Sequence, residues 1–276
     1  MTAAFRKKER MIDQKTKESY EQNGYTVIKG LLNLSALTDI KEEILEVGQY
    51  IVGPDFKFSG YDPALVTPEK QSALYDRLHY LPSLSRLSGN HQLLQLCKDL
   101  GMKVPVLMGC CNMRYDRPHD SKHLFEWHQD TLYLLGSLNA VTLWIPFGPV
   151  DKHHGTIEVI PGSHKNGLYP FKKISDKPVE AHRQFLQRDL SIDQEITEEP
   201  VMIEADFGDI VVFKQMLLHK SCANNSDKVR WTAQIRISDL GSDEFLQQGC
   251  PSGDKKNVFF QNYPGFKHSL SVSREK

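Results

Sequence analysis

The segment Glu126-Trp127-His128-Gln129-Asp130 carries a histidine and an aspartate two positions apart. In a β-strand, residues two apart point to the same face, so we expect the imidazole of His128 and the carboxylate of Asp130 side by side. One more histidine would complete a 2-His-1-carboxylate triad, which holds Fe(II) on one face and leaves the other coordination positions open. Because the chain has 11 histidines, such a pair can arise by chance and is weak evidence alone.

A second group of polar residues follows further along the chain. The pattern predicts a turn and a buried strand over 208–213, with His219 just beyond the strand's end. The turn-rich segment 224–227 and a second strand carrying Arg230 come next, so we expect a hairpin with the histidine and the arginine on opposite arms. An arginine there could bind the far carboxylate of a dicarboxylate that chelates the metal, because a guanidinium is permanently charged and binds carboxylates bidentately. Ser221 shares the face of His219 and could donate a second hydrogen bond.

The elements that must position these residues are helical at first and β-rich after Gly101. Apolar spacing and capping signals predict helices at about 16–22, 35–47, 67–78 and 91–100, and a brief strand at 25–28. Strands are predicted at 104–114, 140–147, 156–160, 201–203, 209–214 and 229–238. Short strands separated by turn clusters are typical of sandwiches and barrels. The long charged stretch 165–200 is expected to be a partly helical lid or insert.

This pattern predicts a flexible N-terminal arm over 1–15 and one domain over 16–276. Within that domain we expect a helical layer at 16–101, a β core at 102–239 and a C-terminal tail at 240–276. We find no internal repeat that would suggest a solenoid.

Composition narrows the class of protein. The chain has 276 residues, 39% of them hydrophobic, with 34 Lys+Arg against 35 Asp+Glu. This is the composition of a globular protein, and the balanced charge argues against nucleic acid as a partner. No apolar stretch approaches the roughly 18 residues of a membrane span, and no signal peptide is apparent. Five cysteines, an odd number without a C-x-x-C pair, predict reduced thiols and a cytoplasmic location.

Taken together, the motifs resemble the phytanoyl-CoA dioxygenase-like family of iron(II)/2-oxoglutarate-dependent oxygenases, over about residues 20–239. The residues that carry the resemblance are His128-Gln129-Asp130, the run 159–164, Gly208-Asp209, His219, Ser221 and Arg230. The resemblance implies a mainly β protein with N-terminal helices, whose core is a double-stranded β-helix, the cupin-like jelly roll. The metal would lie at its open mouth.

By the same resemblance, His128, Asp130 and His219 bind Fe(II). The co-substrates would be 2-oxoglutarate and O2, and the reaction would hydroxylate a small molecule while 2-oxoglutarate is decarboxylated to succinate. Related halogenases replace the aspartate with a small residue, so the presence of Asp130 favours hydroxylation. The resemblance names neither the substrate nor the oligomeric state, and it implies no membrane partner. The alternatives are a cupin-like metalloprotein that does not use 2-oxoglutarate and a non-catalytic jelly-roll binding module.

Four further positions are expected to contact the co-substrate. The resemblance implies that Arg230 and Ser221 hold the C5 carboxylate of 2-oxoglutarate, and that Trp144 and Met113 line its pocket. Arg236 shares strand parity with Arg230, so alternation alone does not separate them.

Other histidines and cysteines have simpler interpretations. His164 follows a strand and is the main rival of His219 as a ligand, but it lies in a predicted turn. His153-His154 is expected in an exposed turn and His123 in a loop. Cys110-Cys111 would point to opposite faces of a strand, so the two cannot bind one metal together.

Overall fold

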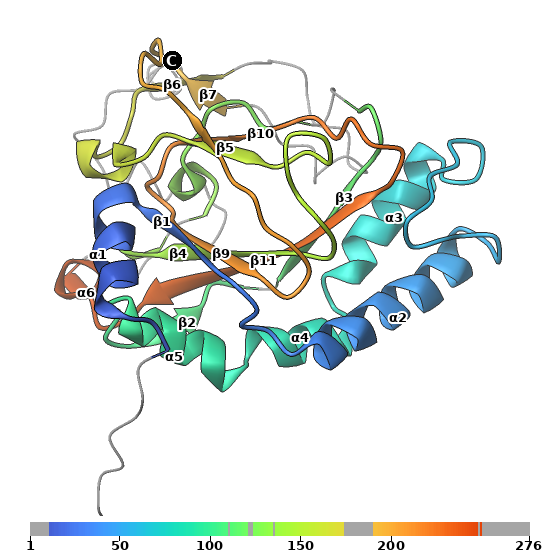
Figure 1. The fold of residues 1–276 in the computed structure, drawn as a ribbon, viewed down its shortest axis with the longest axis horizontal. Coiled ribbons are helices and arrows are strands. Elements are labelled where there is room, and N and C mark those ends of the chain that lie inside the picture. The colour runs from blue at the N-terminus through green and yellow to red at the C-terminus, as the bar shows by residue number, and fades with distance from the viewer. Residues whose placement is uncertain are drawn as a thin grey trace, which may run out of the picture.

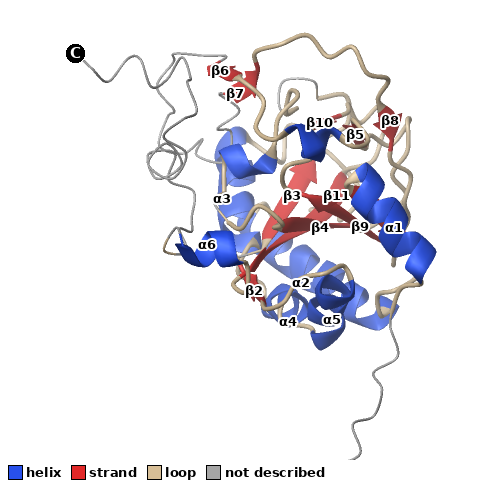
Figure 2. Ribbon diagram, turned by 90° about the vertical axis from the view of Figure 1, so that its left-hand side faces the viewer, coloured by secondary structure: helices blue, strands red, loops and turns tan. Residues whose placement is uncertain are grey.

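The protein is built from a layer of helices, a large sheet and a small sheet stacked in that order (Figures 1 and 2). The computed structural model describes residues 11–109, 111–120, 124–134, 136–173, 190–247 and 249. Within these residues α2, α4 and α5 cover one face of the large sheet, and the small sheet covers the other (Figure 2). This arrangement is the expected mainly β fold, a jelly-roll core with N-terminal helices.

Four of the described helices lie where capping and apolar spacing predict them, and two short ones, Pro82–Ser88 and Asp243–Gln247, fall where no helix was predicted. Their bounds are α1 Gln14–Asn23, α2 Leu34–Ile51, α3 Pro68–Leu78, α4 Pro82–Ser88, α5 His91–Asp99 and α6 Asp243–Gln247. Thr67 caps α3, and a proline occupies the first turn of that helix, as expected. Asn33 caps α2, because its side chain accepts a hydrogen bond from the Ser35 amide at 2.9 Å.

The strands form two sheets that face each other and a separate hairpin. Their bounds are β1 Tyr25–Ile28, β2 Pro105–Leu107, β3 Asn112–Asp116, β4 Val141–Pro146, β5 Ile157–Val159, β6 Phe171–Lys173, β7 Leu190–Ile192, β8 Val201–Met202, β9 Ile210–Lys214, β10 His219–Ser221 and β11 Arg230–Asp239. The large sheet has the order β1-β9-β4-β11-β2, with β3 also paired to β11. The small sheet has the order β10-β5-β8.

The two sheets enclose an interior that differs from the core beneath the helices. Trp231, Ala233, Ile235 and Ile237 of β11 join the apolar core shared with the helices. Because side chains alternate along a strand, the residues between them face the small sheet. These interior residues are Arg230, Thr232, Gln234 and Arg236. The large sheet therefore presents one apolar face and one polar face.

The predicted hairpin between His219 and Arg230 is not formed. Strand β10, which begins at His219, pairs with β5 in the small sheet, whereas β11 pairs with β2, β3 and β4. The chain crosses between the sheets around Asn224, whose side-chain amide donates to the backbone carbonyls of Asp116 and Lys228. His219 and Arg230 thus lie on strands of opposite sheets, a relation that local turn signals do not specify.

The two ends and the insert differ in part from the expectation. Met11 donates its backbone N–H to the Asp99 carboxylate at 2.7 Å and Ile12 is buried, so the last part of the predicted arm packs on the protein. The described ends of the 165–200 insert form the β6–β7 hairpin and a short 3₁₀ turn at Ser163–Asn166. Residues 174–189 and most of the predicted tail lie outside the described residues.

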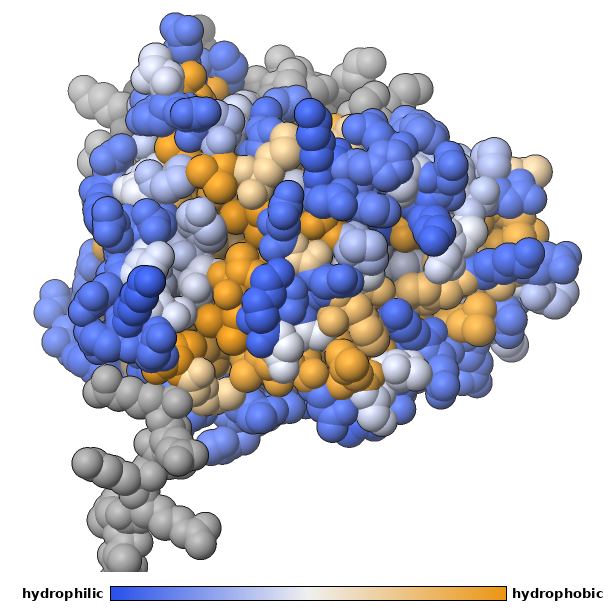
Figure 3. Space-filling model, in the orientation of Figure 1, coloured by the Kyte–Doolittle hydropathy of each residue, from blue (hydrophilic) through white to orange (hydrophobic). Residues whose placement is uncertain are grey.

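The face seen in Figure 3 is largely hydrophilic, with hydrophobic residues gathered in a band across its middle and along its lower edge. Among the described residues, no helix combines the length and apolarity that crossing a bilayer requires.

Candidate metal centre

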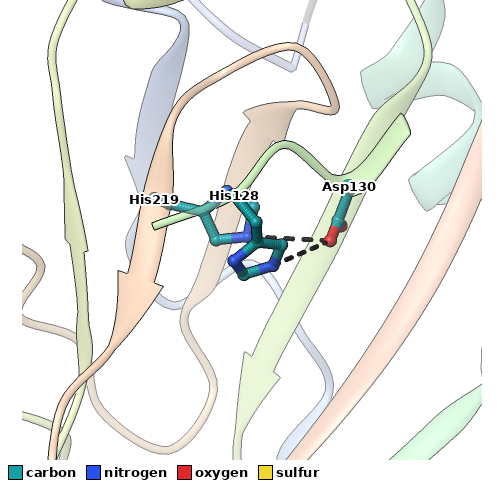
Figure 4. A group of neighbouring side chains, drawn as sticks. All are labelled: His128, Asp130 and His219. Carbon is teal, nitrogen blue, oxygen red and sulfur yellow. Dashed lines mark ion pairs between the residues drawn. The ribbon is translucent and has the colours of Figure 1, made fainter. Parts of the chain in front are cut away.

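Three predicted ligands meet inside the sandwich. The Nε2 atoms of His128 and His219 each lie 3.6 Å from Oδ1 of Asp130 (Figure 4). One potential ligand atom from each residue falls within 4.8 Å of the others, and all three residues are about 95% buried. Within the described part of the chain this is the one group of three such residues with metal-binding geometry.

The backbone positions the two histidines directly opposite each other. His128 and His219 form an antiparallel β-bridge, in which each amide donates to the other's carbonyl at 3.0 Å. This bridge adds the 125–128 segment to the small sheet beside β10. Asp130 is not on a strand with His128, as the H-x-D spacing suggested, but begins a 3₁₀ turn over Asp130–Leu132. That turn directs the carboxylate back towards both imidazoles.

Backbone carbonyls select the histidine nitrogens that face the centre. Nδ1 of His128 lies 2.7 Å from the carbonyl of Glu126, and Nδ1 of His219 lies 2.9 Å from that of Leu217. A carbonyl accepts only, so Nδ1 carries the proton and donates, which leaves an Nε2 lone pair towards Asp130 on each ring. Burial, with a contribution from His128, lowers the pKa of His219 to about 4, so its imidazole is neutral at pH 7. Neutral imidazoles and a carboxylate suit a divalent first-row metal.

The aspartate is held in its charged form. Burial alone would raise the pKa of Asp130, but the nearby Arg236 guanidinium and the two histidines keep it well below its usual range. Oδ2 accepts a hydrogen bond from Thr142 at 2.6 Å. That contact leaves Oδ1, the oxygen nearest both imidazoles, for a metal.

Gln129, between the histidine and the aspartate, is a support that motif reasoning missed. It is completely buried, and its amide donates to the carbonyls of Gly167 and Met216 while its oxygen accepts from the Tyr169 amide. Gln129 therefore connects the ligand segment to two other loops. Thr142 was also missed, although it shares a strand face with Trp144 and alternation could have indicated it.

Arg230 lies at the other end of the interior face of β11. Its guanidinium is 3.0 Å from the carboxylate of Asp116, which also binds Arg114 at 2.6 Å. Burial would raise the pKa of Asp116, but the two guanidinium groups hold it well below its usual range. The three residues form an Arg–Asp–Arg cluster that carries one net positive charge.

The surroundings of Arg230 leave room for another group. Its Nε is buried without a hydrogen-bond partner among the described residues, and so is Oγ1 of the neighbouring Thr232. A side chain at position 155 would place its Cβ 2.7 Å from the guanidinium, so Gly155 is what lets the arginine lie there. The carbonyl of Thr156 accepts from both Arg230 and the amide of Cys222, which joins Arg230 to the end of β10 beyond Ser221.

The two other residues predicted to line the co-substrate pocket, Trp144 and Met113, lie on opposite faces of the large sheet. Trp144 is 2% exposed and lies in the cluster between the two sheets, on the same strand face as Thr142. Met113 is completely buried in the core beneath the helices, so the structure does not bring it to the centre. The physical reason is strand alternation: Arg114 faces the interior, and its neighbour Met113 must face away.

Three histidines considered as alternatives do not approach the centre. His164 lies 3.2 Å from the Glu21 carbonyl near α1, and His154 pairs with Asp151 beside the exposed His153. His123 and Cys110 lie outside the described residues.

Comparison with known proteins decides the family. The model of the phytanoyl-CoA dioxygenase (PhyH) family matches residues 20–232. The chain belongs to this family. As a PhyH-family protein with this His–Asp–His centre, it is a non-heme iron(II)/2-oxoglutarate-dependent oxygenase, with O2 as the oxidant.

Individual PhyH relatives are distant. The chain is 24% identical to "Phytanoyl-CoA dioxygenase 1" of Oryza sativa subsp. japonica, over 83% of this chain and 90% of that protein. It is also 24% identical to "1-deoxypentalenic acid 11-beta-hydroxylase" of Streptomyces arenae, over 75% and 73% of the two chains.

Solved structures share the fold. The non-heme monooxygenase ThoJ superposes with a TM-score of 0.59 at 18% identity, covering 81% of this chain and 77% of that one. The α-ketoglutarate-dependent carbocyclase SnoK superposes with a TM-score of 0.57 at 17% identity, covering 88% and 93%.

Proposed function

We propose that this PhyH-family oxygenase hydroxylates a small-molecule substrate, with His128, Asp130 and His219 as its iron ligands. The observation that carries the proposal is the pair of Nδ1–carbonyl hydrogen bonds, which turn both Nε2 atoms towards one oxygen of Asp130. Outer partners of this kind orient metal-bound histidines and fix their tautomers. Three protein ligands leave open positions for a chelating co-substrate and oxygen.

In this proposal Arg230 binds the C5 carboxylate of 2-oxoglutarate, and Ser221 donates a hydrogen bond to the same group. The net positive charge of the Arg–Asp–Arg cluster and the unpartnered Nε of Arg230 suit an incoming carboxylate. Ser221 lies two residues beyond His219, or about 7 Å along the strand. An extended five-carbon diacid spans such a distance.

Trp144 is the proposed wall of the co-substrate pocket, because it fills the space between the sheets on the face that carries Thr142. Met113 has no part in this proposal. An apolar wall limits water around the bound co-substrate, and water exclusion protects reactive chemistry.

Bound iron supplies the oxidative chemistry, in which 2-oxoglutarate loses CO2 to give succinate and the substrate gains a hydroxyl. The chain's own residues orient the ligands and the co-substrate and exclude water from them. Thr142 holds the Asp130 carboxylate at Oδ2, Gln129 fixes the ligand segment, and Arg230 sets the direction of the co-substrate.

The relatives suggest a small substrate without naming it. One relative is named for a CoA thioester and another for a free acid. The intact triad favours catalysis over the non-catalytic binding module, since such a module would not need Fe(II) ligands.

The test is succinate formation from 2-oxoglutarate with Fe(II) and ascorbate, measured beside binding of 2-oxoglutarate to the Mn(II) protein. His219→Ala should abolish both metal binding and succinate formation, while His153→Ala, in an exposed turn, should change neither. Unchanged succinate formation in His219→Ala would refute the ligand assignment. Failure of the wild type to bind 2-oxoglutarate in the presence of metal would refute the proposed function.

A further inference from the structure

Arg236 is a buried cation whose guanidinium is largely unpartnered. Its side chain is 10% exposed and faces the interior of the sandwich. Its terminal Nη2 donates to Oε1 of Gln234 at 2.6 Å. Nε and Nη1 are buried and have no hydrogen-bond partner among the described residues. Leaving a charged donor unsatisfied is costly, so a missing partner is the feature that needs explaining.

Balancing the charge of Asp130 does not account for this guanidinium. The distance from Nε of Arg236 to Oδ2 of Asp130 is 3.7 Å, which is too long for a hydrogen bond. Oδ2 already accepts from Thr142 at 2.6 Å, and Oδ1 faces the two imidazoles. Arg236 therefore lies beside the metal centre without using its fork on the ligand.

A second unpartnered polar atom belongs to a side chain that interacts electrostatically with Arg236. Nε2 of His79, the C-cap residue of α3, is buried without a hydrogen-bond partner among the described residues. Burial mainly, together with the charge of Arg236, lowers the pKa of His79 to about 4, although Asp76 opposes the shift. The two groups are thus electrostatic neighbours.

The charges inside the sandwich leave one positive charge over. Among the residues that the structure describes, the interior arginines are Arg114, Arg230 and Arg236, and the interior aspartates are Asp116 and Asp130. Three cations against two anions give a net charge of +1. Iron(II) and the 2-oxoglutarate dianion of the proposed function cancel each other and do not alter this excess. A monoanion beside Arg236, whose Nε and Nη1 have no partner among the described residues, would balance this excess.

We propose that Arg236 binds a carboxylate of the substrate itself, with Gln234 orienting the guanidinium. The inference rests on the proposed function and adds the substrate class, a free carboxylic acid. Nε and an Nη of one guanidinium form the planar fork that matches a carboxylate bidentately. A carboxylate also carries the single negative charge that the interior lacks.

A carboxylate subsite beside the metal argues against a CoA thioester as the substrate. The carbonyl of a thioester is neutral and supplies no charge for Arg236, and burial of a lone cation is unfavourable. The CoA phosphates would have to reach positive charge elsewhere.

The test uses full-length protein loaded with Mn(II) and saturated with 2-oxoglutarate, so that the Arg230 subsite is filled. Acetate, the smallest carboxylate with a methyl group, and acetamide, its neutral counterpart, are titrated by calorimetry. We expect acetate to bind at least about 10-fold more tightly than acetamide, and Arg236→Gln to remove that preference. Arg236→Lys should retain part of it, and Arg77→Gln, on the exposed face of α3, should retain all of it.

Each outcome separates the inference from the proposed function. If 2-oxoglutarate does not bind the Mn(II) protein, the proposed function fails. If it binds normally but acetate and acetamide bind alike, or acetate binds Arg236→Gln as tightly as the wild type, only the inference fails. Tighter binding of methyl phosphate than of acetate would overturn the carboxylate assignment. Loss of 2-oxoglutarate binding in Arg236→Gln, with binding retained in Arg230→Gln, would make Arg236 the co-substrate residue instead and overturn the inference.

Discussion

The two faces of β11 perform different tasks. On one face Trp231, Ala233, Ile235 and Ile237 are at most 2% exposed and pack into the core beneath the helices. On the other face two arginines and two polar residues line the space between the sheets, and several of their buried atoms have no hydrogen-bond partner in the described part of the chain. Burial of apolar area stabilises the fold, whereas a row of unsatisfied donors contributes nothing until an anion binds. Because side chains alternate along β11, one face of this strand contributes to stability and the other to function.

The largest expected effect is on metal binding at the polar side of the large sheet. Asp130→Ala removes the one anionic ligand, and we expect affinity for Mn(II) to fall by more than about 1000-fold because a charged donor is lost from a buried site. Calorimetry on the metal-free protein measures this. Asp55→Ala, at an exposed position in the turn that follows α2, is the matched control. Retained tight binding would exclude Asp130 as a ligand.

The next largest effect is on the stability that the apolar face of β11 provides. Ile235→Ala should lower the free energy of unfolding by about 3 kcal/mol, because it leaves a cavity in a tightly packed core. Urea unfolding of the metal-free protein is the measurement. The Mn(II) affinity of the folded variant should stay within about 2-fold of the wild type. A parallel loss of affinity would show that the two faces are not independent.

A smaller effect tests the far end of the polar face. Arg230→Lys keeps the charge but loses the planar fork, so the half-saturating concentration of 2-oxoglutarate should rise about 30-fold. Succinate formation measures it, with Arg86→Lys, whose side chain is exposed on α4, as the control. An unchanged concentration would argue that Arg230 does not bind the co-substrate.

Removing a supporting hydrogen bond sharpens the comparison within the polar face. Thr142→Val deletes the hydroxyl that donates to Oδ2 of Asp130, and we expect metal affinity to fall about 10-fold. Thr38→Val, at an exposed position of α2, controls for the replacement of a threonine by a valine. No change in affinity would mean that the turn alone positions the carboxylate.

The smallest effect extends the comparison to the helical layer. The folded protein disfavours protonated His79, whose pKa burial lowers to about 4, whereas the unfolded chain binds that proton near pH 6.5. The unfolded state therefore binds more protons between pH 6.5 and 4, and stability falls as pH decreases through this window. Between pH 7 and 5 His79→Gln should lose about 1 kcal/mol less than the wild type in urea unfolding. Parallel pH curves would contradict this.

Local sequence determined much of this protein. The cap at Thr67, apolar periodicity and turn clusters correctly located four of the six described helices and most strands, because these signals act over a few residues. The motif residues His128, Asp130 and His219 were predicted as one site, and the structure brings them together. The family resemblance placed Met113 in the co-substrate pocket, whereas its side chain lies in the core beneath the helices, since a one-residue difference along a strand reverses the face.

Only the tertiary structure decided how the arms of the predicted hairpin separate into strands of opposite sheets. It also decided that Asp116 pairs with Arg230 while Arg236, of identical parity, retains free donors beside the metal centre. The sequence specifies which residue types share a strand face. Which of them find partners depends on the pairing of strands that are far apart in the sequence. Local propensities do not encode such pairing.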